Sequence, residues 1–176
     1  MARRFMQFSL LIGTIFNLSS VFAHYQPIQS SPHKKLQVDT ILVEKQKHKM
    51  TLYHNNRPIK TYNIALGFNP EGHKEQEGDG KTPEGVYYIT GKNPQSRFHL
   101  SLKLSYPSIN DQNKAQRKGI NPGSNIMIHG LGPRFHSKGK WHALKDWTLG
   151  CIAVTNDEIE EIFHYADVGT KVEILP

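Results

Sequence analysis

The feature that most constrains this fold is a series of short runs of β-branched, aromatic and other apolar residues, separated by turn-forming residues. Runs of about four to eight residues of this kind are typical of β-strands. The predicted strands are residues 40–44, 50–54, 60–66, 85–90, 100–104, 126–128, 152–154 and 171–175. The sequence therefore predicts a mainly β domain with one or two short helices.

One helix is indicated by the residues at its start. Thr155 and Glu158 form a capping box, in which each side chain accepts a hydrogen bond from the other residue's backbone N–H. Apolar residues then recur at helical spacing, and Gly169 is predicted to end the helix. The polar residues 110–118 favour a short exposed helix or a loop, and residues 69–85, rich in Gly, Pro and charge, favour a long surface loop.

The N-terminus has the pattern of a secretory signal peptide. Arg3 and Arg4 precede a mostly apolar run that is short for a membrane span, and small or β-branched residues stand at the cleavage-site positions before and at Ala23. We expect residues 1–23 to be a cleaved signal peptide, 24–39 a flexible lead-in and 40–176 the single folded domain. The protein is then secreted across the inner membrane to the periplasm or cell wall, with no stable membrane insertion after cleavage.

The chain is basic, with 22 Lys and Arg residues against 15 Asp and Glu. A basic exported protein is attracted to an anionic wall or outer-membrane surface. Its lysines are scattered and no nucleic-acid-binding motif is present, so no nucleic-acid partner is expected.

Cys151 is the only cysteine of the chain. Exported proteins usually hold cysteines in disulfide pairs, so a lone thiol needs another explanation. Upstream, the apolar run 126–128 ends at His129, an imidazole that can take the proton of the thiol and hold the resulting ion pair. A thiol and a base that each adjoin an apolar strand indicate nucleophilic catalysis.

Four segments together resemble the YkuD-type L,D-transpeptidase family. An apolar strand ending in His129-Gly130 precedes Thr148-Leu149-Gly150-Cys151 and a second apolar strand. Residues 40–45 and 50–53 resemble the family's first hairpin, residues 64–67 its third strand, and residues 80–88 its Lys-Thr-Pro-x-Gly-x-Tyr segment. The resemblance covers about residues 40–175.

This resemblance implies a β-sandwich-like domain that cleaves peptidoglycan stem peptides between an L-centre and a D-centre. Cys151 would be the nucleophile that forms a thioester, and His129 the general base and later the acid. The backbone N–H groups of Gly150 and Cys151 would contribute to the oxyanion hole. We expect no cofactor and no metal.

Five further residues are expected to bind substrate. Gly130 and Thr148 belong to the motif, and the Thr148 hydroxyl takes the position where the family has Ser or Thr. Trp147 is expected to form a wall or lid, and Tyr106 to lie along the family's substrate channel. Arg134 is expected to pair with a stem-peptide carboxylate.

Two motif positions depart from the family's common pattern. Leu149 stands where the family often has histidine, and Ala153 where it often has arginine. This variant resembles a divergent branch that includes hydrolases, so the acyl acceptor stays open between an amine and water. The alternative to transfer is an L,D-carboxypeptidase, or an amidase that releases a wall-linked lipoprotein, which would then be a partner.

Other functions fit the sequence less well. A lone cysteine is often a small buried hydrophobe, and a wall-binding module without catalysis would not need a thiolate. A metallopeptidase would require ligands such as His136 and His142, but these do not form a His-Glu-x-x-His helix or another known metal pattern.

Overall fold

The computed structural model describes residues 37–176 of the 176-residue chain. The predicted signal peptide and nearly all of the predicted lead-in lie outside the described residues. The folded region begins with strand β1 at Val38, two residues before the predicted start of the domain. Within residues 37–176, no helix is long and apolar enough to cross a bilayer.

Eight strands form one curled sheet, which confirms the predicted mainly β class. Their order across the sheet is β3-β2-β1-β8-β4-β5-β6-β7, with parallel pairing of β1 with β8 and of β6 with β7. The strands are β1 (Val38–Glu44), β2 (Lys49–His54), β3 (Arg57–Asn63), β4 (Gly85–Ser96), β5 (His99–Leu104), β6 (Met127–His129), β7 (Ile152–Ala153) and β8 (Ala166–Leu175).

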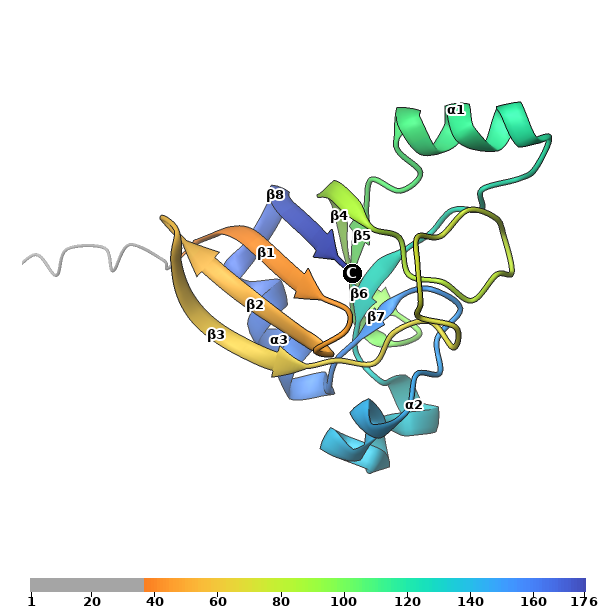
Figure 1. Ribbon diagram of the computed structural model, residues 1–176. Helices are drawn as coiled ribbons and strands as arrows, with labels where there is room; N and C mark the ends of the chain where they lie inside the picture. The colour runs from red at the N-terminus through yellow and green to blue at the C-terminus, as the bar shows by residue number, and fades with distance from the viewer. Residues whose placement is uncertain (1–36) are drawn as a thin grey trace, which may run out of the picture. The chain divides into compact units, whose positions relative to one another are not determined.

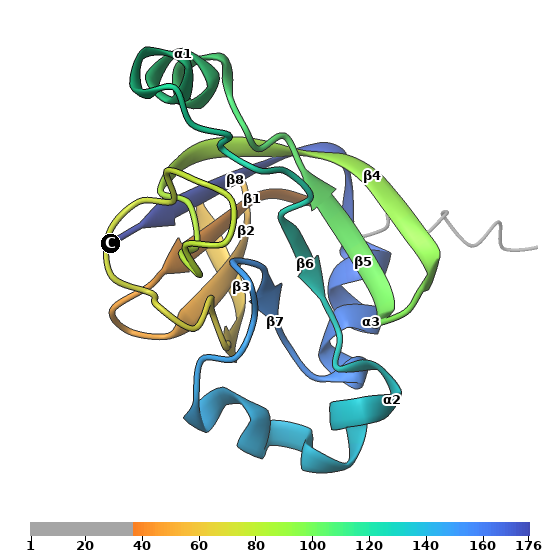
Figure 2. The same cartoon turned by 90° about the vertical axis from the view of Figure 1, so that its right-hand side faces the viewer.

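The sheet curls until the chain beyond one edge strand meets the other edge (Figures 1 and 2). The long strand β4 pairs with β8 through its first half and with β5 through the rest, so it belongs to both halves of the sheet. After β3, Ala65 exchanges backbone hydrogen bonds of 3.0 and 2.8 Å with Ala153 of β7. This contact brings the residues after β3 next to the residues that precede β7.

The core is formed by side chains that alternate along the strands. In β8, Val172 and Ile174 are buried while their neighbours are less so, and Ile41 and Val43 of β1 follow the same two-residue period. The largest of the fully buried side chains are Tyr87, Ile41, Met50, Leu52, Ile64, Leu66, Ile89, Leu102, Leu104, Ile128, Leu131 and Ile152. One continuous apolar core therefore supports both halves of the curled sheet.

Helix α3 (Asn156–Tyr165) has the predicted capping box, with hydrogen bonds in both directions between Thr155 and Glu158. It packs against β5, β6 and β8. The prediction that Gly169 ends this helix is wrong, because the helix ends at Tyr165 and Gly169 lies within β8 with φ of 94°. Pairing of Val38 with Ala166 begins the strand directly after the helix.

Helix α1 (Ile109–Lys118) occupies the segment predicted as a short helix or loop. Its N-cap is Ser108, its C-cap is Gly119 in the left-handed conformation, and it extends away from the sheet (Figure 2). Two further short helical segments, α2 (Gly132–Phe135) and η1 (His136–Leu144), follow β6 at the opposite end of this view.

The segment between β3 and β4 is not entirely a surface loop, contrary to the prediction for residues 69–85. Lys45 at the end of β1 is buried, and its ammonium group donates hydrogen bonds to Gly72 O, Thr82 O and Glu84 Oε1 at 2.6 to 3.0 Å. The side chain of Thr82 is also buried and accepts a hydrogen bond from Gly67 N. Buried polar contacts therefore help to fix this segment to the sheet.

We expect Lys45→Met to lower the free energy of unfolding by about 2–3 kcal/mol, because two carbonyls and a carboxylate lose a buried cation. Denaturant unfolding of the two proteins measures this difference. Lys47→Met is the matched control, since Lys47 is exposed and, in the described part of the chain, its ammonium group bonds to Glu44 alone. Equal denaturation midpoints for Lys45→Met and the wild type would contradict a stabilising role of Lys45.

Candidate active site

Strands β6 and β7 bring His129 and Cys151 to one place. His129 is the last residue of β6, and Cys151 directly precedes β7. The two strands are parallel, with Ile128 opposite Ile152 and His129 opposite Ala153. His129 and Cys151 consequently line the same cavity, which has a volume of about 620 Å³.

His129 is held with a defined tautomer. Its side chain is buried, and Nδ1 lies 2.6 Å from the carbonyl oxygen of Gly130. Because a carbonyl can only accept, Nδ1 carries the proton and Nε2 has a free lone pair. Burial lowers the pKa of His129 to about 4, although the Gly130 carbonyl opposes this effect. The imidazole is therefore neutral at neutral pH.

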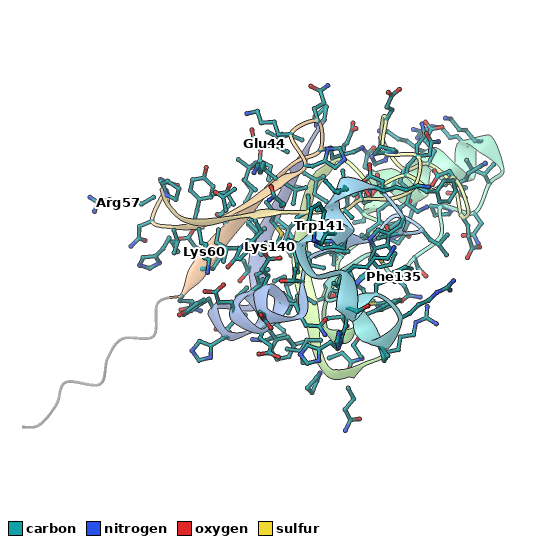
Figure 3. All side chains as sticks on the ribbon, turned by 90° about the horizontal axis from the view of Figure 1, so that it is seen from below. Glu44, Arg57, Lys60, Phe135, Lys140 and Trp141 are labelled. Carbon is teal, nitrogen blue, oxygen red and sulfur yellow. The ribbon has the colours of Figure 1, made fainter. Side chains whose placement is uncertain are left out.

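Aromatic side chains surround the imidazole. The Phe98 ring stacks on His129 with a centroid distance of 4.3 Å and an interplanar angle of 23°. Trp147 meets His129 edge-on at 5.9 Å and packs in turn on Phe135 at 4.5 Å. Figure 3 shows Phe135 on the segment that follows β6, with the exposed Trp141 further along the same segment. These contacts fix the orientation of the imidazole ring without a carboxylate.

The surroundings of the Cys151 thiol favour its protonated form. Sγ donates to the carbonyl oxygen of Asn125 at 3.6 Å. Burial raises the pKa of the thiol, although a backbone hydrogen bond of Met127 and the charges of Lys74 and Arg97 oppose this effect. The expectation that His129 can take the proton of this thiol stays a prediction. Desolvation disfavours both charged forms, so the resting pair is a neutral thiol and a neutral imidazole.

Gly150 is required by close backbone packing. Its φ is 125°, and a Cβ atom here would lie 2.5 Å from the carbonyl oxygen of Lys81. Its N–H donates to Thr148 Oγ1 at 3.0 Å, so in this structure it is not free to serve an oxyanion hole as expected. Among residues 37–176, the N–H of Cys151 has no hydrogen-bond acceptor, which leaves it available to a substrate oxygen.

Thr148 fixes the turn that carries Cys151. Its hydroxyl donates to Cys151 O at 2.8 Å and accepts from Gly150 N. Its backbone pairs with the chain after β3, through Leu66 O at 3.1 Å and Phe68 N at 2.9 Å. The Thr148 side chain therefore ties together both ends of the turn while it also lines the cavity.

The structure brings together Cys151, His129, Thr148 and Trp147 of the predicted site residues. The other three substrate-binding predictions are not supported by their positions. Gly130 is buried where a Cβ atom would meet Phe98 O and Asn156 Oδ1 at 2.8 Å, so its role is packing.

Arg134 and Tyr106 also lie elsewhere. Arg134 is exposed on α2, with its guanidinium 5.4 Å from the centroid of the Phe135 ring, and does not line the cavity. Tyr106 is buried in the core, where its hydroxyl donates to Pro122 O at 2.8 Å and its ring meets Tyr87. Neither side chain is placed to bind a substrate in this cavity.

Several cavity residues were not predicted. Lys74 comes from the segment between β3 and β4, Arg97 and Phe98 from the turn between β4 and β5, and Asn125 from the residues before β6. Asn125 has φ of 60°, a left-handed conformation that a turn-forming residue tolerates. The Arg97-Phe98 pair lies between two predicted strands, residues 85–90 and 100–104. This position could have indicated that the pair forms a hairpin tip.

The two histidines considered as metal ligands, His136 and His142, differ in solvent exposure. His136 is exposed on η1, whereas His142 is buried with no hydrogen-bond partner for Nδ1 in the described part of the chain. Across residues 37–176, no three His, Cys, Asp or Glu side chains cluster in a way that could hold a metal ion.

The neutral thiol predicts a characteristic pH dependence of alkylation. We expect the rate of iodoacetamide reaction with Cys151 to keep rising beyond pH 9.0, the ordinary thiol pKa, since burial raises the pKa of this thiol. Stopped reactions analysed by intact mass give the rates. A rate plateau between about pH 5 and 7 that disappears in His129→Gln would contradict the neutral pair and indicate an ion pair.

We also expect Thr148→Val to lower the free energy of unfolding by about 2 kcal/mol, because the Gly150 N–H loses its acceptor in a buried turn. Thr148→Ser keeps the hydroxyl and serves as the matched control. Urea unfolding of both variants measures the effect. Equal losses in the two variants would show that the methyl group of Thr148, rather than its hydroxyl, supports the turn.

Two curated relatives are similar to most of the chain. The Escherichia coli (strain K12) protein named "Putative L,D-transpeptidase YafK" is 26% identical over 165 residues, covering 90% of this chain and 57% of that protein. The Bacillus subtilis (strain 168) protein named "Putative L,D-transpeptidase YqjB" is 27% identical over 164 residues, covering 90% of this chain and 84% of that protein. The chain spans little more than half the length of the E. coli relative.

Solved structures show the same fold. The helical cell shape determining protein Pgp2 from Campylobacter jejuni has a TM-score of 0.60 at 24% identity, covering 81% of this chain and 51% of that chain. Bd1075 from Bdellovibrio bacteriovorus has a TM-score of 0.57 at 24% identity, covering 82% and 50%. The model of the YkuD family, described as the L,D-transpeptidase catalytic domain, matches residues 38–174. The chain therefore belongs to the YkuD family of L,D-transpeptidase catalytic domains.

Proposed function

We propose that this protein is an exported cysteine enzyme that acts on peptidoglycan stem peptides through a Cys151 thioester, with L,D-transpeptidase activity. The observation that carries the proposal is the cavity shared by Cys151 and a His129 whose Nε2 is free to accept a proton. Membership of the YkuD family supports the substrate class.

In the first step, His129 Nε2 takes the thiol proton and Sγ attacks the carbonyl carbon of the L-centre. The negative charge on the carbonyl oxygen is met by the N–H of Cys151. The C–N bond then breaks, the imidazolium returns its proton to the leaving amine, and a thioester remains on Cys151. Because both charged forms are disfavoured at rest, proton transfer and attack are coupled to substrate binding.

In the second step, an amine or water attacks the thioester. His129 Nε2 takes a proton from the attacking group and the C–S bond breaks. The imidazolium then returns this proton to the leaving Cys151 thiolate, which restores the thiol. An amine acceptor gives a new peptide bond, and this is L,D-transpeptidation. Water gives a shortened stem peptide or releases an attached protein.

Hydrolysis is the second candidate, and it is favoured by residues on either side of Cys151. Leu149 lines the cavity with an apolar side chain where the family often has histidine, so it offers no hydrogen bond to an incoming amine. Ala153, where the family often has arginine, is fully buried and is bonded through its backbone to Ala65, so this position offers no cation to the site. The hydrolase would be an L,D-carboxypeptidase or an amidase that releases a wall-linked lipoprotein.

The test is mass spectrometry of muropeptides after the mature protein is incubated with purified sacculi. We expect new cross-links or exchanged terminal residues, since the thioester transfers its acyl group to an amine. Shortened stems or released protein fragments without new bonds would instead establish the hydrolase.

Cys151→Ala is the control for this experiment, because it removes the nucleophile from a partly exposed position and leaves the turn intact. We expect it to reduce product to the level of untreated sacculi. Products that persist with Cys151→Ala would overturn the thioester mechanism. Binding to sacculi without any product, in both proteins, would favour a wall-binding module.

A further inference from the structure

The segment that follows β6, residues 131–145, carries charge of one sign only. It contains four Lys or Arg residues and no Asp or Glu, and we call it the basic segment. All four cations are exposed, and they are Arg134, Lys138, Lys140 and Lys145. Across residues 37–176, none of the four forms an ion pair. The basic segment therefore presents unbalanced positive charge to solvent.

The carboxylates next to the basic segment are engaged by other groups. Asp146, directly after the segment, accepts hydrogen bonds from Leu66 N at 2.7 Å and from His48 Nε2 at 2.9 Å. Glu158 belongs to the capping box of α3, and its charge acts on His142 of η1. Neither carboxylate is paired with a cation of the segment, so the exposed cations are left for an external partner.

Trp141 and Leu144 add exposed apolar surface to the basic segment. Each of these side chains is 76% exposed. Because a 3-10 helix has three residues per turn, the two side chains lie on the same side of η1. His142, between them in the sequence, is only 3% exposed and faces the rest of the domain. The outer side of η1 is therefore apolar, and Lys140 and Lys145 stand next to it in the sequence.

The basic segment is fixed to the domain by contacts on its inner side. Leu131 is buried at the start of the segment, and its N–H donates to Asn156 Oδ1 at 2.9 Å. The Phe135 ring packs on Trp147 with a centroid distance of 4.5 Å, and the ammonium of Lys138 lies 5.1 Å from the centroid of the same Phe135 ring. A partner that meets the outer side therefore does not have to order the segment first.

We propose that the outer side of the basic segment docks reversibly on an anionic phospholipid membrane. Charge complementarity selects this partner, because the exposed cations match the headgroup phosphates. Trp141 and Leu144 would enter the boundary between headgroups and acyl chains, which tryptophan favours for its apolar ring and polar N–H. A hydrated wall polymer would match the cations but leave Leu144 in water. This inference goes beyond the proposed function and requires no catalysis.

Vesicle binding by the mature protein tests the proposal. The vesicles contain equal parts of phosphatidylglycerol and phosphatidylcholine, or phosphatidylcholine alone, and co-sedimentation gives the partition coefficient. We expect binding to the anionic vesicles only, and weaker binding as salt is added, because salt screens exposed charges. We also expect the anionic vesicles to shift tryptophan fluorescence to shorter wavelength, and Trp141→Phe to lose this shift.

Two double variants locate the docking surface. Lys138→Gln combined with Lys140→Gln should lower the partition coefficient for anionic vesicles about 10- to 30-fold. Lys114→Gln combined with Arg117→Gln is the matched control, since it removes the same charge from exposed positions of α1, at the opposite end of the view in Figure 2. We expect this control to bind within about twofold of the mature protein. Circular dichroism checks that each variant is folded.

Trp141→Ser tests the apolar part of the surface. We expect it to lower the partition coefficient about 10-fold, because the indole no longer leaves water on binding. The exposed position of Trp141 makes this variant compatible with the fold. An unchanged partition coefficient would overturn the proposed entry of Trp141 into the membrane.

Three further results would overturn the proposal. The first is no binding of the mature protein to the anionic vesicles. The second is an equal loss in the two double variants, since net charge rather than the basic segment would then set the affinity. The third is a loss of binding to purified sacculi in the Lys138 and Lys140 double variant with vesicle binding unchanged, which would assign the basic segment to a wall polymer.

Discussion

The site depends on how closely backbone packs against backbone around the short strand β7. Hydrogen bonds hold this strand on one side to β6 and on the other to Ala65, whose side chain and that of Ala153 are small and fully buried. A Cβ atom at Gly67 would lie only 2.1 Å from Gly80 O, and Gly150 packs on Lys81 O in the same way. Larger side chains at these positions would push the neighbouring backbone segments apart and displace Cys151.

Most of the fold was predictable because strand and cap signals are local. The alternation in β8 identifies its buried face, and the capping box of α3 lies within four adjacent residues. The second half of β4 was missed, since its polar residues owe their strand conformation to pairing with β5 rather than to an apolar pattern. Gly169 was misassigned for a similar reason, as the start of β8 is set by pairing with β1.

The candidate site was predictable only where the motif itself forms it. Cys151, His129, Thr148 and Trp147 line one cavity because the motif sets the order of two neighbouring strands. Arg97 reaches the cavity through a hairpin tip packed on a distant glycine segment, and no local pattern encodes that contact. The charge state of the thiol depends on burial, which a sequence cannot specify.

The imidazole of His129 is oriented by a neutral carbonyl and by aromatic rings, whereas many catalytic histidines rely on an aspartate or glutamate. Among residues 37–176, no carboxylate is therefore hydrogen-bonded to this base. An anionic peptide approaching the thiol meets no electrostatic barrier from that side. A carboxylate bonded to His129 would also stabilise the imidazolium form. Without one, the lifetime of the imidazolium depends on the bound substrate.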